Sequence, residues 1–393
     1  MLTPRSTLTR RVMAALDASP SRIPVLLGGC GTGRTTLLHQ LRDRLPRTAS
    51  LYLDVERTAT TPERFLRAVA AAGAFPVDET SPAGTRAAFD AVLAFFARPR
   101  AGASEPTTFL LDEFLELRTF ESFPGLRRVL HDFVEGVTGS VNRFVLTSRY
   151  TARTLRLLCD HSARFDVIHV PPLTVEDTFD ILGPVGSDGN PDGTHDGEYA
   201  AKTLQALADG RPAYVRALAD ELAVMGSHGG RDLVSALAAL LATEGRLAKQ
   251  CGFCYELRLH RARGYGALKA ILEILADEEG LTLTEISQRL QRTPGSTKDY
   301  LSWLEDVDLV TAQQKHYRFT DPLLRLWVRL HCRASRPTED DLAREVRGYA
   351  LPRLPHPPAL VPVFLHLALV LMMGIFIPPY LAAWYRQAAA LIG

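Results

Sequence analysis

One stretch near the N-terminus constrains the fold of this chain more than any other. A short apolar run, Val25–Leu27, is followed by the glycine-rich segment Gly28–Thr35 and then by a helical pattern that extends to Leu41. This order of strand, loop and helix is what the phosphate-binding pattern G-x-x-x-x-G-K-[ST] requires. Glycines let backbone N–H groups turn inward around an anion, and the N-terminus of the following helix adds its dipole. The stretch therefore predicts a P-loop and a nucleotide site.

Most residues of this loop match the pattern, and one does not. Arg34 stands where the pattern has lysine, and a guanidinium keeps the positive charge but is bulkier and planar. Thr35 is expected to place its hydroxyl on Mg²⁺. We expect nucleotide binding here, whereas rapid hydrolysis does not follow from this loop. The residues expected to hold the nucleotide are Gly28, Gly29, Cys30, Gly31, Thr32, Gly33, Arg34, Thr35 and Thr36.

Apolar runs alternate with helical patterns after the loop. The expected strands are residues 50–55, 107–114, 143–149 and 165–173, and the helices between them are 62–72, 85–96, 126–134 and 155–159. This alternation predicts an α/β P-loop NTPase core over residues 1–173, a parallel sheet with helices on both faces. Ligands of such sheets lie beyond the carboxyl ends of the strands, so functional side chains are expected there.

Charged residues follow two of these strands. Asp112 is expected to hold Mg²⁺ together with Thr35, and Glu113 to activate water as a general base. The alternative is that this acidic pair caps the next helix. Arg149 follows Thr147 and Ser148, and its guanidinium suits the γ-phosphate. The alternative there is a surface arginine at a strand end.

Residues 174–245 are predicted to form a helical lid. One helix begins at Gly210-Arg211-Pro212, where proline suits the first helical turn. This turn either only begins the helix or packs against an adenine base, which would bring Gly210 and Pro212 to the nucleotide. Residues 246–333 follow with the order helix, helix, helix and hairpin that is typical of a winged helix-turn-helix.

The order of these motifs resembles the STAND-type signalling ATPases. It is more similar to their archaeal-type ATPase branch, which has an AAA-like core and a C-terminal winged helix. The segment Tyr317–Trp327 looks like the end of that branch, and the resemblance covers roughly residues 1–333. It implies a switch driven by ATP and ADP with Mg²⁺, which acts on a protein partner of unknown identity. A catalytically inactive scaffold that holds its nucleotide permanently is an alternative.

The winged helix is also a candidate for binding DNA, and its charge argues against this. Residues 265–333 contain nine Lys and Arg against ten Asp and Glu, and the whole chain carries a formal net charge of +1. Proteins that bind DNA usually concentrate basic residues against the phosphates. A DNA-binding regulator that is tuned by nucleotide therefore remains the second hypothesis.

Two metal-like patterns are incomplete. Residues 188–193 match the first half of an EF-hand loop, but Tyr199 stands where its last ligand should be, so we expect a solvated loop. Cys251 and Cys254 have C-x-x-C spacing in a helical segment without a second pair, so no zinc or redox site is expected. The five cysteines are scattered, which favours a reducing compartment.

The C-terminal region is apolar. A charged and then proline-rich linker is expected at 334–358, and residues 359–385 contain no Asp, Glu, Lys or Arg. A bilayer needs about 20 apolar residues, so we expect a transmembrane segment here. Arginines precede this run and only Arg386 follows it, which would keep the ATPase cytoplasmic at the inner or cell membrane. Because Pro378 and Pro379 interrupt the run, an apolar hairpin buried on protein is the alternative.

Overall fold

The computed structural model describes residues 5–46, 50–72, 84–98, 106–161, 163–183, 193–226, 232–260, 264–333 and 335–355. Contacts divide the chain into two compact units, Met1–Arg353 and Leu354–Gly393, and all elements named below belong to the first. The expected membrane segment at 359–385 and most of the EF-hand-like loop lie outside the described residues. Among the helices that are described, none has the length and apolar character to cross a bilayer.

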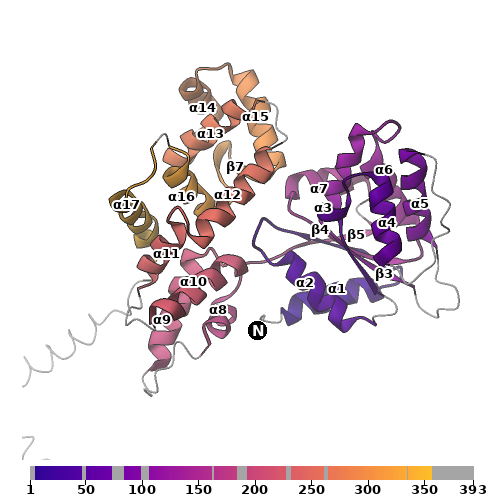
Figure 1. The fold of residues 1–393 in the computed structure, drawn as a ribbon, viewed down its shortest axis with the longest axis horizontal. Coiled ribbons are helices and arrows are strands. Elements are labelled where there is room, and N and C mark those ends of the chain that lie inside the picture. The colour runs from indigo at the N-terminus through magenta and orange to yellow at the C-terminus, as the bar shows by residue number, and fades with distance from the viewer. Residues whose placement is uncertain are drawn as a thin grey trace, which may run out of the picture. The chain divides into compact units, whose positions relative to one another are not determined.

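A parallel sheet of five strands organises the N-terminal half, as predicted (Figure 1). Its order is β2-β3-β4-β1-β5, and all its pairs are parallel. The strands are β1 (Ile23–Leu27), β2 (Ser50–Asp54), β3 (Thr108–Asp112), β4 (Arg143–Ser148) and β5 (Phe165–His169). Because β1, β3 and β4 are neighbours with parallel carboxyl ends, the residues that follow them meet at one edge of the sheet.

Helices cover both faces of this sheet (Figure 1). Alternate strand residues point to opposite faces, so Leu26 and Leu110 join a core with α1 (Ser6–Asp17) and α2 (Arg34–Arg44). Val25 and Leu111 join the core of the other face. The helices there are α3 (Val55–Thr58), α4 (Pro62–Ala72), α5 (Thr85–Ala97) and α6 (Val129–Gly139), with the 3-10 helix η1 (Phe114–Ser122). The chain continues from β4 through α7 (Thr151–Leu158) and the 3-10 helix η2 (Cys159–His161) into β5.

Five helices follow the sheet: the first four lie where the helical lid is expected, at 174–245, and the fifth lies within 246–333, the range expected for the winged helix-turn-helix. They are α8 (Val175–Leu182), α9 (Gly193–Leu207), α10 (Pro212–Gly226), α11 (Leu233–Leu241) and α12 (Arg246–Leu259). Capping side chains fix two of their starts, since Thr174 caps α8 and Asp232 caps α11. Proline begins α10, where its missing N–H costs no helical hydrogen bond.

The winged helix-turn-helix follows, as predicted. It comprises α13 (Tyr265–Asp277), β6 (Leu281–Thr282), α14 (Leu283–Leu290), α15 (Pro294–Asp306), β7 (Val310–Gln313) and β8 (His316–Phe319). The three strands form an antiparallel sheet in the order β6-β8-β7. The helix α16 (Pro322–His331) comes next, capped by Asp321, whose side chain accepts from Leu323 N–H and Leu324 N–H.

The segment expected as a linker differs from that expectation. It contains α17 (Glu339–Ala350) and the 3-10 helix η4 (Leu351–Arg353). Val346, Tyr349 and Ala350 of α17 are buried, and the Tyr349 hydroxyl donates to Leu207 O over 2.9 Å. The charged residues that suggested a linker form the exposed face of an amphipathic helix.

Candidate functional site

The glycine-rich loop has a backbone that only glycine adopts readily. Gly31 and Gly33 have φ angles of 78° and 87°, in the left-handed region, and Gly33 is the N-cap of α2. A Cβ at Gly28 would lie 2.8 Å from Thr32 Oγ1, so a side chain there would require Thr32 to shift. The loop therefore combines the glycines and the helix N-terminus that anion binding requires.

Arg34 is folded against the loop and buried, with 7% of its surface exposed. Its Nη1 donates to Gly28 O, to Gly29 O over 2.5 Å and to Thr32 Oγ1 over 3.2 Å. Its Nη2 lies 2.5 Å from Glu113 Oε1. One guanidinium thus joins the carbonyls of the loop to the acid that follows β3.

Glu113 is held between two arginines. Besides Arg34, it contacts Arg149, whose backbone N–H donates to Glu113 Oε2 over 3.0 Å and whose Nε lies 3.2 Å from the same oxygen. Burial raises the pKa of Glu113, but the charges of Arg34 and Arg149 and their hydrogen bonds outweigh it, so the net pKa is lowered. Glu113 also has a φ of 57°, an uncommon angle for a non-glycine residue. Its side chain makes no capping bond to η1, so the capping alternative lacks support.

Asp112 ends β3 with both carboxylate oxygens engaged. Thr147 Oγ1 donates to Oδ1 over 2.5 Å, and the Tyr52 hydroxyl donates to Oδ2 over 3.1 Å. Burial, followed by the charge of Asp112, raises the pKa of Tyr52, so this hydroxyl keeps its proton. Thr35 lies on the first turn of α2 and lines the adjacent pocket. Across the described residues, no group of three or more His, Cys, Asp and Glu could hold a metal by itself.

Arg149 is buried, with 5% of its surface exposed, so it is not a surface residue at a strand end. Its Nη2 forms an ion pair with Glu56 of α3. Burial opposes the charged guanidinium, but the carboxylates of Glu113 and Glu56 outweigh it and raise the pKa of Arg149. The sequence did not indicate Glu56, because this residue follows a different strand with no motif around it.

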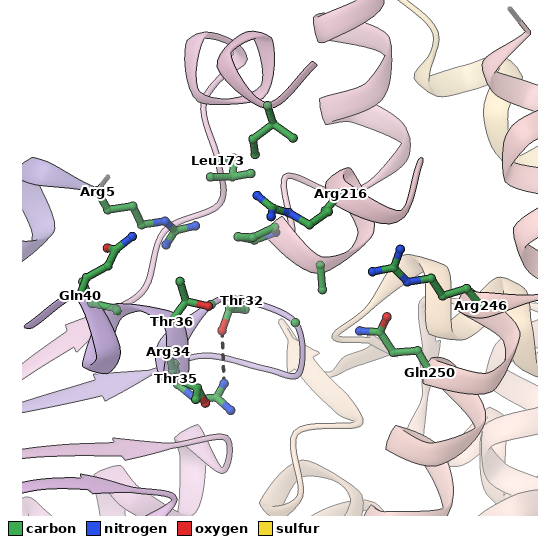
Figure 2. A pocket seen from close by; sticks show the side chains of 16 residues that line it. Arg5, Thr32, Arg34, Thr35, Thr36, Gln40, Leu173, Arg216, Arg246 and Gln250 are labelled. Carbon is green, nitrogen blue, oxygen red and sulfur yellow. Dashed lines mark hydrogen bonds between the residues drawn. The ribbon is translucent and has the colours of Figure 1, made fainter. Parts of the chain in front are cut away.

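A pocket of about 390 Å³ opens beside the loop (Figure 2). Its apolar wall includes Leu173, Ile181 and Pro212. Its other lining residues are Arg5, Gly31, Thr32, Gly33, Arg34, Thr35, Thr36, Leu37, Gln40, Ala213, Arg216, Arg246 and Gln250. The pocket thus offers an apolar surface for a base beside the loop that would hold phosphates, which fits a nucleotide.

The predicted Gly210–Pro212 turn forms part of this pocket. Gly210 has a φ of 58°, and a Cβ there would lie 2.6 Å from Pro172 Cβ, so the close approach requires glycine. Pro212 Cγ lies 3.5 Å from the position of a Cβ on Gly33, and Ala213 N–H donates to Gly31 O over 3.2 Å. The turn therefore does more than begin α10, because it contacts the loop directly.

Sequence reasoning missed several arginines of the pocket. Figure 2 shows Arg5 and Arg216 pointing toward it from opposite sides, and Arg246 on α12 beside Gln250. The Nη1 and Nη2 atoms of Arg5 are buried, and among the described residues they have no hydrogen-bond partner. Burial lowers the pKa of Arg5, and the charge of Asp177 only partly offsets this. These nitrogens fit an anionic ligand, but the sequence gave no signal for Arg5, which belongs to no motif.

Arg211 connects the loop to the end of the winged helix. Its Nη1 donates to Cys30 O over 3.1 Å, and its Nη2 donates to Thr320 O over 3.1 Å. It also lies 3.3 Å from Asp321 Oδ2, which accepts from the Tyr214 hydroxyl over 2.8 Å. The Gly-Arg-Pro turn was predicted for its glycine and proline, yet its arginine makes these contacts.

A second connection joins the winged helix to the core. The Asp308 carboxylate accepts from Thr151 N–H at the start of α7, and Arg156 of α7 pairs with Asp306. Arg258 of α12 donates to Asp308 O over 3.3 Å. Burial raises the pKa of Asp308 to about 6, although the Thr151 N–H and the Arg258 charge oppose this.

Comparisons with known proteins found one family model and several similar solved structures. Residues 267–311 match the family described as winged helix-turn-helix DNA-binding. The chain is similar to a Walker-type ATPase of Pyrococcus abyssi, with 17% identity, coverage of 84% of this chain and 96% of that one, and a TM-score of 0.62. The ORC2 protein of Aeropyrum pernix in its ADP form is 16% identical, with 89% and 93% coverage and a TM-score of 0.44. Cdc6p from Pyrobaculum aerophilum is 16% identical, with 90% and 96% coverage and a TM-score of 0.42.

No curated protein matches the sequence. The likeness to the Pyrococcus ATPase and the winged-helix match define the class: the chain has the fold of a P-loop ATPase with a C-terminal winged helix-turn-helix. This confirms the predicted core and winged helix. It leaves the STAND subtype as a prediction.

Proposed function

We propose that this protein is a STAND-like switch that binds ATP or ADP and hydrolyses ATP slowly. The observation that carries the proposal is the position of Arg211. Its guanidinium contacts Cys30 O in the loop and Thr320 O beside the winged helix, so one side chain reports the state of the loop to the C-terminal elements. A nucleotide that moves the loop would change these contacts, and the winged helix would be held or released accordingly.

The residues around the pocket fit this ligand. Gly28–Thr36 would hold the phosphates, and the base would lie against Leu173, Ile181 and Pro212. Thr35 and Asp112 would hold Mg²⁺, which neutralises phosphate charge when it is bound. Arg149 would contact the γ-phosphate, and Glu113 would accept a proton from water.

Slow hydrolysis follows from the contacts of Glu113. A general base must face the attacking water, whereas both oxygens of this carboxylate contact arginines. The lowered pKa of Glu113 also weakens it as a proton acceptor. Arg34 would have to leave Glu113 and move to a phosphate before water could be activated.

The central test is a titration of the purified protein with fluorescent ATP and ADP, followed by turnover assays. Thr35→Ala and Asp112→Ala should weaken Mg-ATP binding, while Glu113→Gln should keep it and slow hydrolysis by about 10²–10⁴-fold, the usual contribution of a general base. Failure of the wild-type protein to bind either nucleotide would refute the proposal. Equal turnover in the wild type and Glu113→Gln would remove Glu113 from the base role.

A second candidate function is DNA binding, which the family match at 267–311 favours. The presumed recognition helix α15 carries Lys298 but also Asp299, Glu305 and Asp306, and Asp306 already pairs with Arg156. We therefore propose that the winged helix contacts a protein partner instead. Binding to random duplex DNA, titrated with salt, should be weak at physiological ionic strength. Tight binding that falls steeply with salt would favour the DNA-binding regulator.

A further inference from the structure

A second pocket is lined by residues of β8, α16, α17 and η4. Its volume is about 720 Å³, within the range of about 300–1,000 Å³ that small-molecule sites usually have. It shares no lining residue with the pocket beside the phosphate-binding loop. Five arginines line it, namely Arg318, Arg325, Arg329, Arg344 and Arg353.

The two acids of this pocket are already paired with two of its arginines. Glu279 Oε2 lies 3.4 Å from Arg325 Nη1, and Glu345 Oε2 lies 2.8 Å from Arg329 Nη2. The Nε atoms of both arginines are buried and have no hydrogen-bond partner among the described residues. These arginines therefore carry more donors than the two acids take up.

The other three arginines have one acid between them. Arg344 pairs with Asp341 of its own helix. Arg353 lies over the ring of Tyr349, 3.9 Å from its centre, and donates to Tyr349 O over 2.9 Å. Neither Arg353 nor the exposed Arg318 forms an ion pair within the part of the chain that the structure describes. Three acids for five arginines thus leave two guanidinium charges without an acidic partner.

This excess of charge favours an anionic ligand. Burial lowers the pKa of Arg325; Glu279 opposes this effect, and the charges of Arg329 and Arg353 add to it. An anion between these guanidinium groups would offset their mutual repulsion. The planar fork of arginine matches the oxygens of a phosphate group, which can carry two negative charges.

The strand beside the pocket leaves no free edge for an extended peptide. β8 is the central strand of its sheet, and the Phe319 N–H at its end donates to Glu279 Oε1 over 2.9 Å. A peptide therefore cannot add a strand here. Buried Phe319 and Leu326 instead give the pocket an apolar wall, which is typical of sites for small molecules.

We propose that this pocket binds a small molecule with two or more phosphate groups, which Arg318 and Arg353 contact directly. The proposal does not depend on nucleotide binding at the loop, because the two pockets share no lining residue.

The test titrates the full chain with inorganic tripolyphosphate, measured by isothermal titration calorimetry. Arg318→Gln and Arg353→Gln should each weaken binding roughly 10-fold or more, the effect of losing one charged hydrogen bond. Arg347→Gln is the matched control, because Arg347 is an exposed arginine of α17 that does not line the pocket. Its affinity for tripolyphosphate should equal that of the wild type.

A fourth variant tests the pocket without changing any charge. Gly348 lines the pocket, and a Cβ on it would meet no side chain and no other element within 4 Å. Gly348→Trp should therefore fold normally, occupy part of the pocket and weaken tripolyphosphate binding as the arginine variants do. Unfolding by urea would check that each variant is as stable as the wild type.

Three results would overturn the proposal. Equal losses in Arg318→Gln and Arg347→Gln would show only a general attraction of arginines for an anion. Binding that Thr35→Ala removes and Arg318→Gln leaves would assign the phosphates to the loop and so support the nucleotide site. Binding of duplex DNA that requires Arg318, without binding of tripolyphosphate, would assign the arginines to nucleic acid. A protein that binds tripolyphosphate through Arg318 and Arg353 but binds no ATP or ADP supports this pocket and refutes the nucleotide switch.

Discussion

Arg34 shows how one residue can change a familiar loop. A lysine at this position ends in a single ammonium group, whereas the Arg34 guanidinium has two ends that donate in different directions. One end contacts the carbonyls of Gly28 and Gly29, and the other contacts Glu113. The loop is thereby linked to the acid that would activate water. This link is the reason to expect slow ATP turnover, although the other residues of the phosphate-binding pattern are present.

Replacing Arg34 with lysine should therefore raise turnover. A lysine can still reach a phosphate but cannot donate to the loop carbonyls and to Glu113 at the same time. We expect Arg34→Lys to keep nucleotide affinity and to hydrolyse ATP at least as fast as the wild type, measured as phosphate release at saturating ATP. Arg34→Ala is the control and should bind roughly 10- to 100-fold more weakly, because a charged hydrogen bond contributes about 1.5–3 kcal/mol. Loss of all ATP binding in Arg34→Lys would show that the loop depends on the guanidinium.

At the scale of elements, α7 is held at both ends of its exposed face by the winged helix. Asp308 accepts from the N–H of Thr151 at its N-terminus, and Asp306 pairs with Arg156, five residues later. The helix α7 begins two residues after Arg149. A movement of Arg149 on contact with a γ-phosphate would therefore also displace the start of this helix. The same short element thus touches both the site and the winged helix.

The pKa of Asp308 makes this connection sensitive to pH. Its folded value of about 6 lies above its ordinary value of 3.8, so the folded state binds the proton more tightly than the unfolded state. The stability contributed by Asp308 is therefore full below about pH 4 and is lost as the pH rises through about 6. Asp308→Asn should remove this loss and stabilise the protein at pH 7 by about 1–3 kcal/mol.

Urea unfolding of Asp308→Asn at several pH values between about 4 and 7 would measure this difference. Asparagine also tolerates the left-handed φ of 52° at this position, so the backbone should not be strained further. Asp299→Asn, on the exposed surface of α15, is the matched substitution to be measured alongside it. A difference between Asp308→Asn and the wild type that does not vary with pH would contradict the prediction.

Much of the element order could be predicted because it depends on local patterns. The boundaries of α4 at Pro62 and Ala72, for example, follow from the spacing of its apolar residues. Contacts between distant segments could not be predicted in this way, since Arg211 meets a carbonyl 181 residues away in the sequence. The helix α17 was missed because its charged residues hid the buried spacing of Val346, Tyr349 and Ala350. Which of the many charged residues contact one another can be seen only in the folded structure.

At the scale of the whole molecule, the apolar tail bears on where the protein is located in the cell. We propose that residues 359–385 anchor a cytoplasmic ATPase in the inner or cell membrane. A protein truncated after residue 355 should then move from the membrane fraction to the soluble fraction and still bind nucleotide, because its site lies within residues 5–333. Cell fractionation with detergent extraction would measure this. If the full chain is already in the soluble fraction, the anchor is refuted, and aggregation of the truncated protein would favour a hairpin buried on protein.

The cap that Asp308 provides to α7 also has a consequence during synthesis. Asp308 lies 157 residues after Thr151, so at about 5–20 residues per second the ribosome needs roughly 8–30 s to supply it. The loop, both acids and Arg149 emerge before Arg211, Asp308 and Asp321. The core of the nascent chain therefore exists for this time without its contacts to the winged helix. On the proposed function, the loop would therefore be available to nucleotide before Arg211 and Asp308 make their contacts.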